Sequence, residues 1–447
     1  MSFNEANANG IYRTVKLKEI SFVIKTGKTP PAHVREYMSE GNNFIGSKSV
    51  FDGYIDKSTF LHLNDESMPY LESNSLHEED VLLNVTGDGI TFGRNAMVTK
   101  DILPAYFSQN IAVIRLNKLM VHPKYISYYL NMPMMKEYIN NHSSGSARRA
   151  IPAKNIKELE VRIPDLNIQT TVANILSSLD EKIEVNNQIN KKLEEMAQAI
   201  FKQWFVDFEF PNEEGNPYKS SGGAMVESEL GMIPEGWEVK TLDDITSKFA
   251  TGLNPRKNFV LGQGENFYVT IKNMNNHKVI LDEKCDKVDD DAIQKINNRS
   301  DLLKGDLLFS GIGTIGRVYL IDKTPINWNI SESIFTLRAI PSVSPEFLYL
   351  HLLSPYLQGY ATQLASGSVQ KGIRMADLKK YKLVLPTKKV HDIFTLPIKS
   401  IINKIKSNDN ENIELTKTRK LLLPKLMSGE IRVPIDQERF CIEERWK

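Results

Sequence analysis

Two stretches of the chain repeat apolar residues at alternating intervals of four and three positions, the pattern of helices that pack along a heptad seam. One follows Pro164 and the other follows Pro386, and Asp165 and Thr387 stand where an N-cap side chain accepts a backbone N–H. The first seam comprises Val172, Leu176, Leu179, Ile183, Asn186, Asn190, Leu193, Ala197, Ile200 and Trp204. The second seam comprises Phe394, Ile398, Ile401, Ile405, Asn408, Asn412, Leu415, Arg419, Leu422 and Leu426. Helices of roughly 35 to 40 residues would span roughly 50 to 60 Å at about 1.5 Å per residue.

Asparagine occupies the same two seam positions in both stretches, Asn186 and Asn190 in the first and Asn408 and Asn412 in the second. A buried asparagine in a seam costs stability but penalises wrong registers. Helices this long exceed what one compact domain would bury, so we expect them to pair with each other. The alternative is that each helix packs only on its own domain. We expect the prolines at positions 397 and 424 to kink the second helix near its start and to end or bend it near its close.

The segments that precede the two helices resemble each other at a spacing of 222 to 226 residues. Tyr12, Val15, Leu17, Ile20, Thr26, Gly27 and Pro30 recur as Trp237, Lys240, Leu242, Ile245, Thr251, Gly252 and Pro255. Residues 108–111 and 144–146 return as 331–334 and 366–368. Each copy reads as short strands joined by turns and glycine-rich bends, followed by a short helix and then the long one. The repeat predicts two similar domains of mixed α/β content in one polypeptide.

The repeat and the helices together define five segments in an α+β protein. They are a first domain at 1–164, a first long helix at 165–210, an acidic linker at 211–236, a second domain at 237–386, and a second long helix with the C-terminal region at 387–447. The linker is recognised by its charge, because residues 206–236 carry one basic and seven acidic side chains among glycines, prolines and serines.

Composition narrows the class of protein. With 447 residues, of which 41% are hydrophobic and 25% charged, the chain can bury more than one core. No apolar run reaches the roughly 18 residues of a membrane helix and the start is polar, so we expect a cytoplasmic protein with no membrane contact. Two cysteines and eight scattered histidines predict neither a disulfide framework nor a metal site. Because the net charge is +1, any binding of nucleic acid would have to come from local patches.

Three motifs suggest enzyme chemistry but lack its requirements. Residues 311–316 fit a dinucleotide fingerprint, yet a β-like run follows where a helix is needed, so we predict a hairpin bend. Residues 41–49 resemble a phosphate loop in which an inserted serine displaces Lys48. Asp165, Asp180 and Glu181 have the residue types of a magnesium-dependent nuclease but straddle one helix. The sequence also lacks the amino-methyltransferase motif that holds a flipped base, so no catalytic residue is predicted.

The residues around the end of the first long helix carry a family resemblance. The central motif comprises residues 199–210 (AIFKQWFVDFEF), 215–219 (GNPYK), 222–223 (GG) and 229–237 (ELGMIPEGW), and residues 422–431 (LLPKLMSGEI) form a closing motif. Over nearly its whole length the sequence resembles the DNA-specificity (S) subunit of Type I restriction-modification systems. The resemblance implies two target-recognition domains separated by the two long helices, which form an antiparallel coiled coil with approximate two-fold symmetry inside one chain.

The resemblance also implies which partners supply the chemistry. Such a subunit is not catalytic; it binds double-stranded DNA and docks two adenine-N6 methyltransferase subunits, and two endonuclease/translocase subunits complete a restriction enzyme for phage defence. S-adenosylmethionine, ATP and magnesium would bind those partners, and this chain would carry no cofactor. Target-recognition domains held at opposite ends of a rigid helix pair could bind two different half-sites about one DNA turn, ~34 Å, apart. Two alternatives stay open: a methylation-only specificity subunit without an active endonuclease partner, and a coiled-coil scaffold without DNA contact.

Candidate DNA contacts are basic, amide and hydroxyl side chains at matching places in both copies, because phosphates attract Lys and Arg while base edges need hydrogen-bonding groups. In the first copy they are Thr26, Lys28, Arg94, Ser144, Ser146, Arg148 and Arg149. In the second copy they are Arg256, Lys257, Thr314, Arg317, Ser366, Ser368, Gln370, Lys371 and Arg374. Candidate partner contacts are the aromatic residues Phe201, Trp204, Phe205 and Phe208, for which the alternative is internal core. The target bases depend on loop geometry and groove fit that no simple residue code captures.

Overall fold

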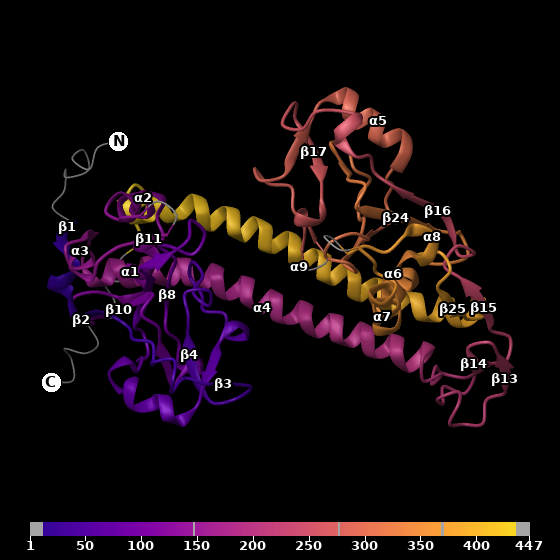
Figure 1. The fold of residues 1–447 in the computed structure, drawn as a ribbon, viewed down its shortest axis with the longest axis horizontal. Helices are drawn as coiled ribbons and strands as arrows, with labels where there is room; N and C mark the ends of the chain where they lie inside the picture. The colour runs from indigo at the N-terminus through magenta and orange to yellow at the C-terminus, as the bar shows by residue number, and fades with distance from the viewer. Residues whose placement is uncertain (1–11, 146–147, 276–277, 368–370, 435–447) are drawn as a thin grey trace. The chain divides into compact units, whose positions relative to one another are not determined.

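The chain folds into two compact units. The first unit joins Met1–Val185 to Glu411–Lys447, and the second is Asn186–Asn410. Each unit holds strands, short helices and one part of each of two long helices, α4 (Leu166–Phe205) and α9 (Lys388–Ser428) (Figure 1). This computed structural model describes residues 12–145, 148–275, 278–367 and 371–434.

The centre of the first unit is an antiparallel sheet of four strands. They are, in order across the sheet, β2 (Ser21–Thr26), β10 (Ile111–Leu116), β6 (Val81–Asn84) and β8 (Asn95–Met97). Successive residues of a strand point to opposite faces, so β6 contributes to two different cores. Val81 and Leu83 pack with helix α1 (Pro123–Leu130) and the start of α4, whereas Leu82 packs on the opposite face against a second sheet. All four residues of β6 are therefore buried.

That second sheet and several smaller elements complete the first unit. The second sheet has the order β3 (Tyr37–Met38), β5 (Leu61–Leu63), β4 (Asn42–Ile45) and β9 (Ala105–Phe107), with β4 and β9 parallel. Strand β1 (Arg13–Lys16) pairs with β12 (Glu160–Ile163), and β7 (Thr86–Gly87) pairs with β11 (Arg149–Ala150). The remaining α-helices are α2 (Pro133–Asn141) and α3 (Ala153–Lys157), and short 3-10 helices connect several of the strands.

The second unit repeats this architecture. Its central antiparallel sheet consists of β16 (Thr246–Thr251), β24 (Ile334–Ala339), β21 (Leu307–Ser310) and β22 (Val318–Leu320), in that order. Strand β15 (Glu238–Thr241) pairs with β25 (Lys382–Leu385), and β17 (Asn266–Val269) runs parallel to β23 (Trp328–Ile330) and antiparallel to β20 (Asp286–Val288). The remaining elements are β13 (Met225–Ser228), β14 (Gly231–Pro234), β18 (Met274–Asn275), β19 (Lys278–Val279), α5 (Asp290–Ser300), α6 (Pro345–Leu353), α7 (Pro355–Gln363) and α8 (Met375–Leu378). The predicted internal repeat and mixed helix and strand content are confirmed.

One ion pair with a buried carboxylate occurs at the same place in both units. Asp80, which precedes β6, accepts two hydrogen bonds of 2.8 Å from Arg115 of β10, one from Nε and one from Nη2. Asp306, which precedes β21, accepts the equivalent bonds from Arg338 of β24 at 2.7 and 2.9 Å. Both carboxylates are buried, at 1% and 0% exposed. In each sheet the two hydrogen bonds between the arginine and the aspartate fix how the two central strands lie against each other.

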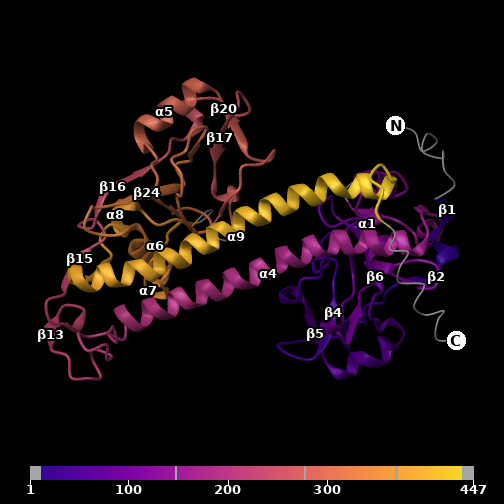
Figure 2. The same cartoon turned by 180° about the vertical axis from the view of Figure 1, so that it is seen from behind.

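The two long helices pack against each other within each unit. In the second unit they lie side by side in both views (Figure 1 and Figure 2). There Asn408 Nδ2 donates to Asn190 Oδ1 at 2.8 Å, and the rings of Phe205 and Phe394 are 4.6 Å apart, so the two helices run in opposite directions. In the first unit, Arg419 of α9 donates to the carboxylate of Asp180 on α4.

The seam positions behave largely as predicted. All four seam asparagines are buried, and the apolar seam residues are buried or partly buried. Helix α9 continues through both of its prolines, so Pro424 does not end it, and a bend at either proline stays a prediction. The burial of Leu426 and Met427 in the core of the first unit holds the last turn helical beyond that proline.

Residues 311–316 form the predicted hairpin bend, because β21 pairs antiparallel with β22 on either side of them. Gly313 and Gly316 have φ of +83° and +91°, the left-handed backbone that glycine adopts without strain. Among the described residues, no helix is long and apolar enough to cross a membrane. The same described ranges contain no group of three or more His, Cys, Asp or Glu side chains that could hold a metal ion.

Candidate nucleic-acid interface

Each unit presents a short hairpin loop where the repeated Ser-Gly-Ser segment lies. In the first unit the backbone N–H and C=O of Ser144 exchange hydrogen bonds of 2.9 Å with Ala150. In the second unit Ser366 and Gly372 exchange the equivalent bonds at 3.0 and 2.9 Å. Gly145 and Gly367 have φ of +91° and +129°, which side-chain-bearing residues rarely adopt, so glycine lets both loops turn.

Three loops meet in the first unit. They include residues 85–94, 108–110 and the described residues 144–145 and 148–150. Arg149 pairs with Gly87 and thereby joins the hairpin loop to the glycine-rich bend. Arg148 Nη2 donates to Asn110 Oδ1 at 3.4 Å, and the Asn110 backbone oxygen accepts the N–H of Val85 at 2.9 Å. The predicted residues Arg148 and Arg149 therefore share one surface with two neighbouring loops.

The corresponding loops meet in the second unit through equivalent bonds. The N–H of Gly311 donates to the Ser333 carbonyl at 2.9 Å, and the Gly311 carbonyl accepts the N–H of Ile373 at 2.9 Å. The N–H of Gly313 donates to the carbonyl of Lys371 at 2.7 Å, which places the glycine-rich bend beside the hairpin loop. Lys371 is exposed at this junction. A basic side chain beside closely approaching glycine backbone suits phosphate binding.

The glycine-rich bend of the first unit carries an exposed apolar tip. Asp88 Oδ1 accepts the backbone N–H of Ile90 at 3.2 Å and that of Thr91 at 2.8 Å. These hydrogen bonds, with that from the Thr91 backbone the strongest, hold the pKa of Asp88 below its ordinary value. Ile90 is 71% exposed. An apolar side chain of this kind can contact a thymine methyl group.

Most of the predicted DNA-contact residues are exposed. These are Thr26, Lys28, Ser144, Arg148, Arg256, Lys257, Thr314, Ser366, Lys371 and Arg374. Arg94, Arg149 and Arg317 are partly buried, and Ser146, Ser368 and Gln370 lie outside the described residues.

Two of the predicted arginines have packing partners inside the chain. Arg317 Nη1 donates to the carbonyl of Ile271 at 2.7 Å and also to that of Met274. The guanidinium of Arg94 lies 4.7 Å from the ring centre of Phe51. Both side chains stabilise the loops that carry them, and their contact with DNA stays a prediction.

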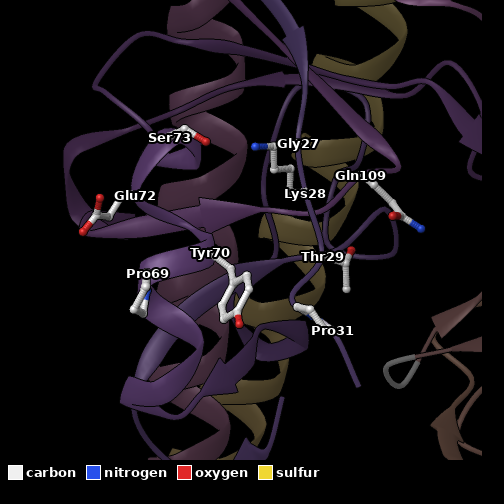
Figure 3. Close-up of a pocket in the computed structure, with 9 residues that line it drawn as sticks. All are labelled: Gly27, Lys28, Thr29, Pro31, Pro69, Tyr70, Glu72, Ser73 and Gln109. Atoms are coloured by element: carbon white, nitrogen blue, oxygen red, sulfur yellow. The ribbon is translucent and has the colours of Figure 1, made fainter. Parts of the chain in front are cut away.

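A pocket of about 520 Å³ lies beside Lys28 in the first unit (Figure 3). Its lining residues are Gly27, Lys28, Thr29, Pro31, Pro69, Tyr70, Glu72, Ser73 and Gln109. Asn74, 1% exposed, joins two of its walls, because its Nδ2 donates to the carbonyls of Lys28 at 3.2 Å and Phe107 at 3.3 Å. Sequence reasoning missed Tyr70 and Gln109, although Gln109 falls inside the repeated segment 108–111.

The aromatic residues at the end of α4 pack in the core of the second unit. Phe201 and Phe205 are 3% and 6% exposed, and the ring of Phe205 lies edge-on to those of Phe394 at 4.6 Å and Phe347 at 5.0 Å. The alternative of internal core therefore accounts for these two residues, whose rings are not available to a partner in this packing. Burial among these rings lowers the pKa of His351 to about 3.

Two further aromatic residues of that group keep part of their surface. Trp204 is partly buried with its ring 5.5 Å from Phe394, and Phe208 is partly buried with its ring 5.7 Å from Trp237. Contact of Trp204 and Phe208 with a partner stays a prediction. The acidic segment that follows contains the β13–β14 hairpin, and its Ile233 is buried in the same core.

Comparisons with known proteins agree on one family. The family model described as the type I restriction modification DNA specificity domain matches twice, at residues 11–195 and 234–425. The HindI type I restriction enzyme specificity subunit of Haemophilus influenzae is 28% identical over 438 residues, covering 85% of this chain and 93% of that protein. The MjaIX specificity subunit of Methanocaldococcus jannaschii is 26% identical over 317 residues, 69% of each protein. A solved type I restriction-modification S subunit from M. genitalium has a similar fold, with a TM-score of 0.56 and 15% identity over 95% of this chain and 98% of that one.

Proposed function

Because the chain belongs to the type I restriction modification DNA specificity family and has a role in DNA sequence specificity, we propose that its two units read the two halves of one bipartite target. The observation that carries the proposal is the meeting of the same loops in both units, with exposed Arg148 in the first and exposed Lys371 in the second. Such cations bind phosphates, and neighbouring side chains reach base edges. The two units differ in sequence at these loops, so the two half-sites differ and the target is asymmetric.

The spacing between the two readers is set, in this proposal, by α4 and α9 acting as an antiparallel coiled coil. The helices have 40 and 41 residues. At ~1.5 Å per residue each is about 60 Å long, which suits half-sites about one DNA turn apart. The hydrogen bond between Asn190 and Asn408 supports a single register, because a shifted helix would leave buried amides unpaired.

The chain supplies no chemistry of its own in this proposal and positions partner subunits on the DNA. Two adenine-N6 methyltransferase subunits would bind S-adenosylmethionine, and two endonuclease/translocase subunits would use ATP and magnesium. Trp204 and Phe208 would add part of the methyltransferase-docking surface. Trp204→Ala is expected to weaken assembly of the modification complex in size-exclusion chromatography, and a fully assembled complex would remove Trp204 from that surface.

Two experiments test the proposed function. Mapping of N6-methyladenine in the host genome with and without this gene is expected to show the loss of one split, asymmetric motif. Gel shifts of the chain with its methyltransferase partner are expected to weaken as salt rises, with log K falling by about 0.9 per contacted phosphate for each unit of log salt. An unchanged methylation pattern together with a flat salt response would favour a scaffold and contradict the proposal.

A further inference from the structure

One corner of each unit lies where the segment after β2 or β16 meets the repeated segment 108–111 or 331–334. The side chains at this corner differ between the two copies. The corresponding pairs are Thr29 and Asn254, Phe44 and Tyr268, and Gln109 and Glu332. The strand register supports the middle pair, because Ile45 of β4 faces Phe107 as Val269 of β17 faces Ile330. Each of the three positions can therefore be compared between the copies.

In the second unit this corner is closed by its own hydrogen bonds. Asn254 Nδ2 donates to Glu332 Oε1 at 2.8 Å. The Tyr268 hydroxyl lies 2.9 Å from Glu332 Oε2 and 2.7 Å from the carbonyl oxygen of Leu253. Burial, and then the neighbouring carboxylate, raise the pKa of Tyr268, so its hydroxyl remains protonated and able to donate. Both oxygens of Glu332 are thus engaged inside the unit.

Among the described residues of the first unit, the same corner has no equivalent hydrogen bonds. Phe44 has no hydroxyl, and Thr29 has a shorter side chain than Asn254. Gln109 is exposed, and its amide makes no hydrogen bond to any residue that the structure describes. Figure 3 shows Gln109 at the rim of the pocket, with its amide turned away from Tyr70. The buried Asn74 stabilises this rim, because its amide donates to the backbone carbonyls of Lys28 and Phe107.

We propose that Gln109 reads a base of the first half-site, whereas the equivalent Glu332 is a positioning residue of the second unit. A glutamine amide donates to N7 and accepts from N6 of adenine in the major groove, so adenine is the expected base. Lys28, exposed on the same rim, supplies a phosphate contact that carries no sequence information. The inference rests on the proposed function, because it assigns a base-reading residue to that same surface.

The test measures methylation of a duplex library by the chain in complex with its methyltransferase partner. Gln109→Ala is expected to relax one position of one half-site, lowering discrimination there by about 5- to 150-fold. Gln109→Glu is expected to move the preference at that position from adenine toward cytosine, whose N4 donates to a carboxylate. Lys28→Ala is the matched control: it is expected to weaken binding to all sequences and to lower the salt slope by about one, with base preferences unchanged.

The outcomes separate this inference from the proposed function. Methylation of no split motif by the parent complex would reject the proposed function itself. If the parent complex methylates a split motif and Gln109→Ala keeps the same base preference at every position, the inference about Gln109 is overturned while the proposed function stands. Gln109 makes no bond within the described structure, so its variants are expected to melt at the same temperature as the parent, and Glu332→Ala is expected to leave the first half-site unchanged.

Discussion

The buried ion pair in the central sheet of each unit allows one unit to be destabilised while the other stays unchanged. Asp306→Asn keeps the shape of the side chain but removes the charge that Arg338 binds through two hydrogen bonds of 2.7 and 2.9 Å. It also weakens the acceptor for the backbone N–H of Leu303, which donates at 2.9 Å. Removing one partner of a buried pair costs about 3–5 kcal/mol, because the other charge stays uncompensated. Arg338 is 27% exposed and lies 3.8 Å from Asp301, so we expect the lower end, about 3 kcal/mol.

Hydrogen exchange followed by mass spectrometry measures this loss unit by unit. Peptides from β21 and β24 are expected to exchange about 150-fold faster in Asp306→Asn, the equivalent of about 3 kcal/mol, with β6 and β10 unchanged. Asp80→Asn is expected to give the reverse pattern. The matched control is Asp243→Asn, whose ion pair with Lys379 at 2.8 Å is 56% and 33% exposed and is expected to contribute less than about 1 kcal/mol. If Asp306→Asn changes exchange no more than Asp243→Asn does, the reasoning about the buried pair is refuted.

Three other perturbations probe the second unit. His351→Leu should reduce its acid sensitivity: with a native pKa of about 3 and an unfolded value of about 6.5, the unfolded chain binds the proton between those pH values. The free energy of unfolding of the parent therefore falls as pH drops through that window, by up to about 1.4 kcal/mol per pH unit. Thermal melts of the parent and of His351→Leu at pH 7 and pH 5 measure this, and an equal loss of stability in the two proteins would contradict it. Gly252→Ala should lower the free energy of unfolding of the second unit by about 1–3 kcal/mol or more in thermal melts, because its new methyl group would overlap the backbone of Ile330. Gly359→Ala is the control and should not destabilise the unit, because there is open space at that position. Asn190→Ala should cost about 1–3 kcal/mol by urea unfolding, because it leaves the buried amide of Asn408 without its acceptor, and an unchanged midpoint would show that the amide finds another partner.

The long helices were predictable because their pattern is local. Val172, Leu176, Phe394 and Ile398 are buried as the seam requires. In the second helix, however, Ile402 is 5% exposed and Ile401 is only partly buried, so the strict four-and-three spacing drifts from the true contact face. An α-helix has 3.6 residues per turn, and a heptad count of 3.5 accumulates that difference unless the helix supercoils.

The candidate interface was predictable as loops rather than as side chains. Its glycines and serines recur along the chain, so the hairpin loops around Gly145 and Gly367 could be located from the repeat. Arg317 and Arg94 look like surface charges in the sequence, yet their partners come from segments more than 40 residues away. Phe205 belongs to a local aromatic stripe, and periodicity alone does not tell whether a stripe faces its own core or a partner.

The first unit takes the last turn of α9 into its core. Leu426 and Met427 lie in the same hydrophobic cluster as Leu17 and Val172. During translation at about 5–20 residues per second, roughly 12 to 50 seconds pass between the synthesis of Val185, where the first part of the unit ends, and that of Met427. In the sequence, the second unit falls wholly between the two segments of the first, so it needs nothing synthesised after Asn410. The earliest-made part of the polypeptide is thus the last to finish folding, and its unprotected apolar surface is where chaperones have the longest time to act.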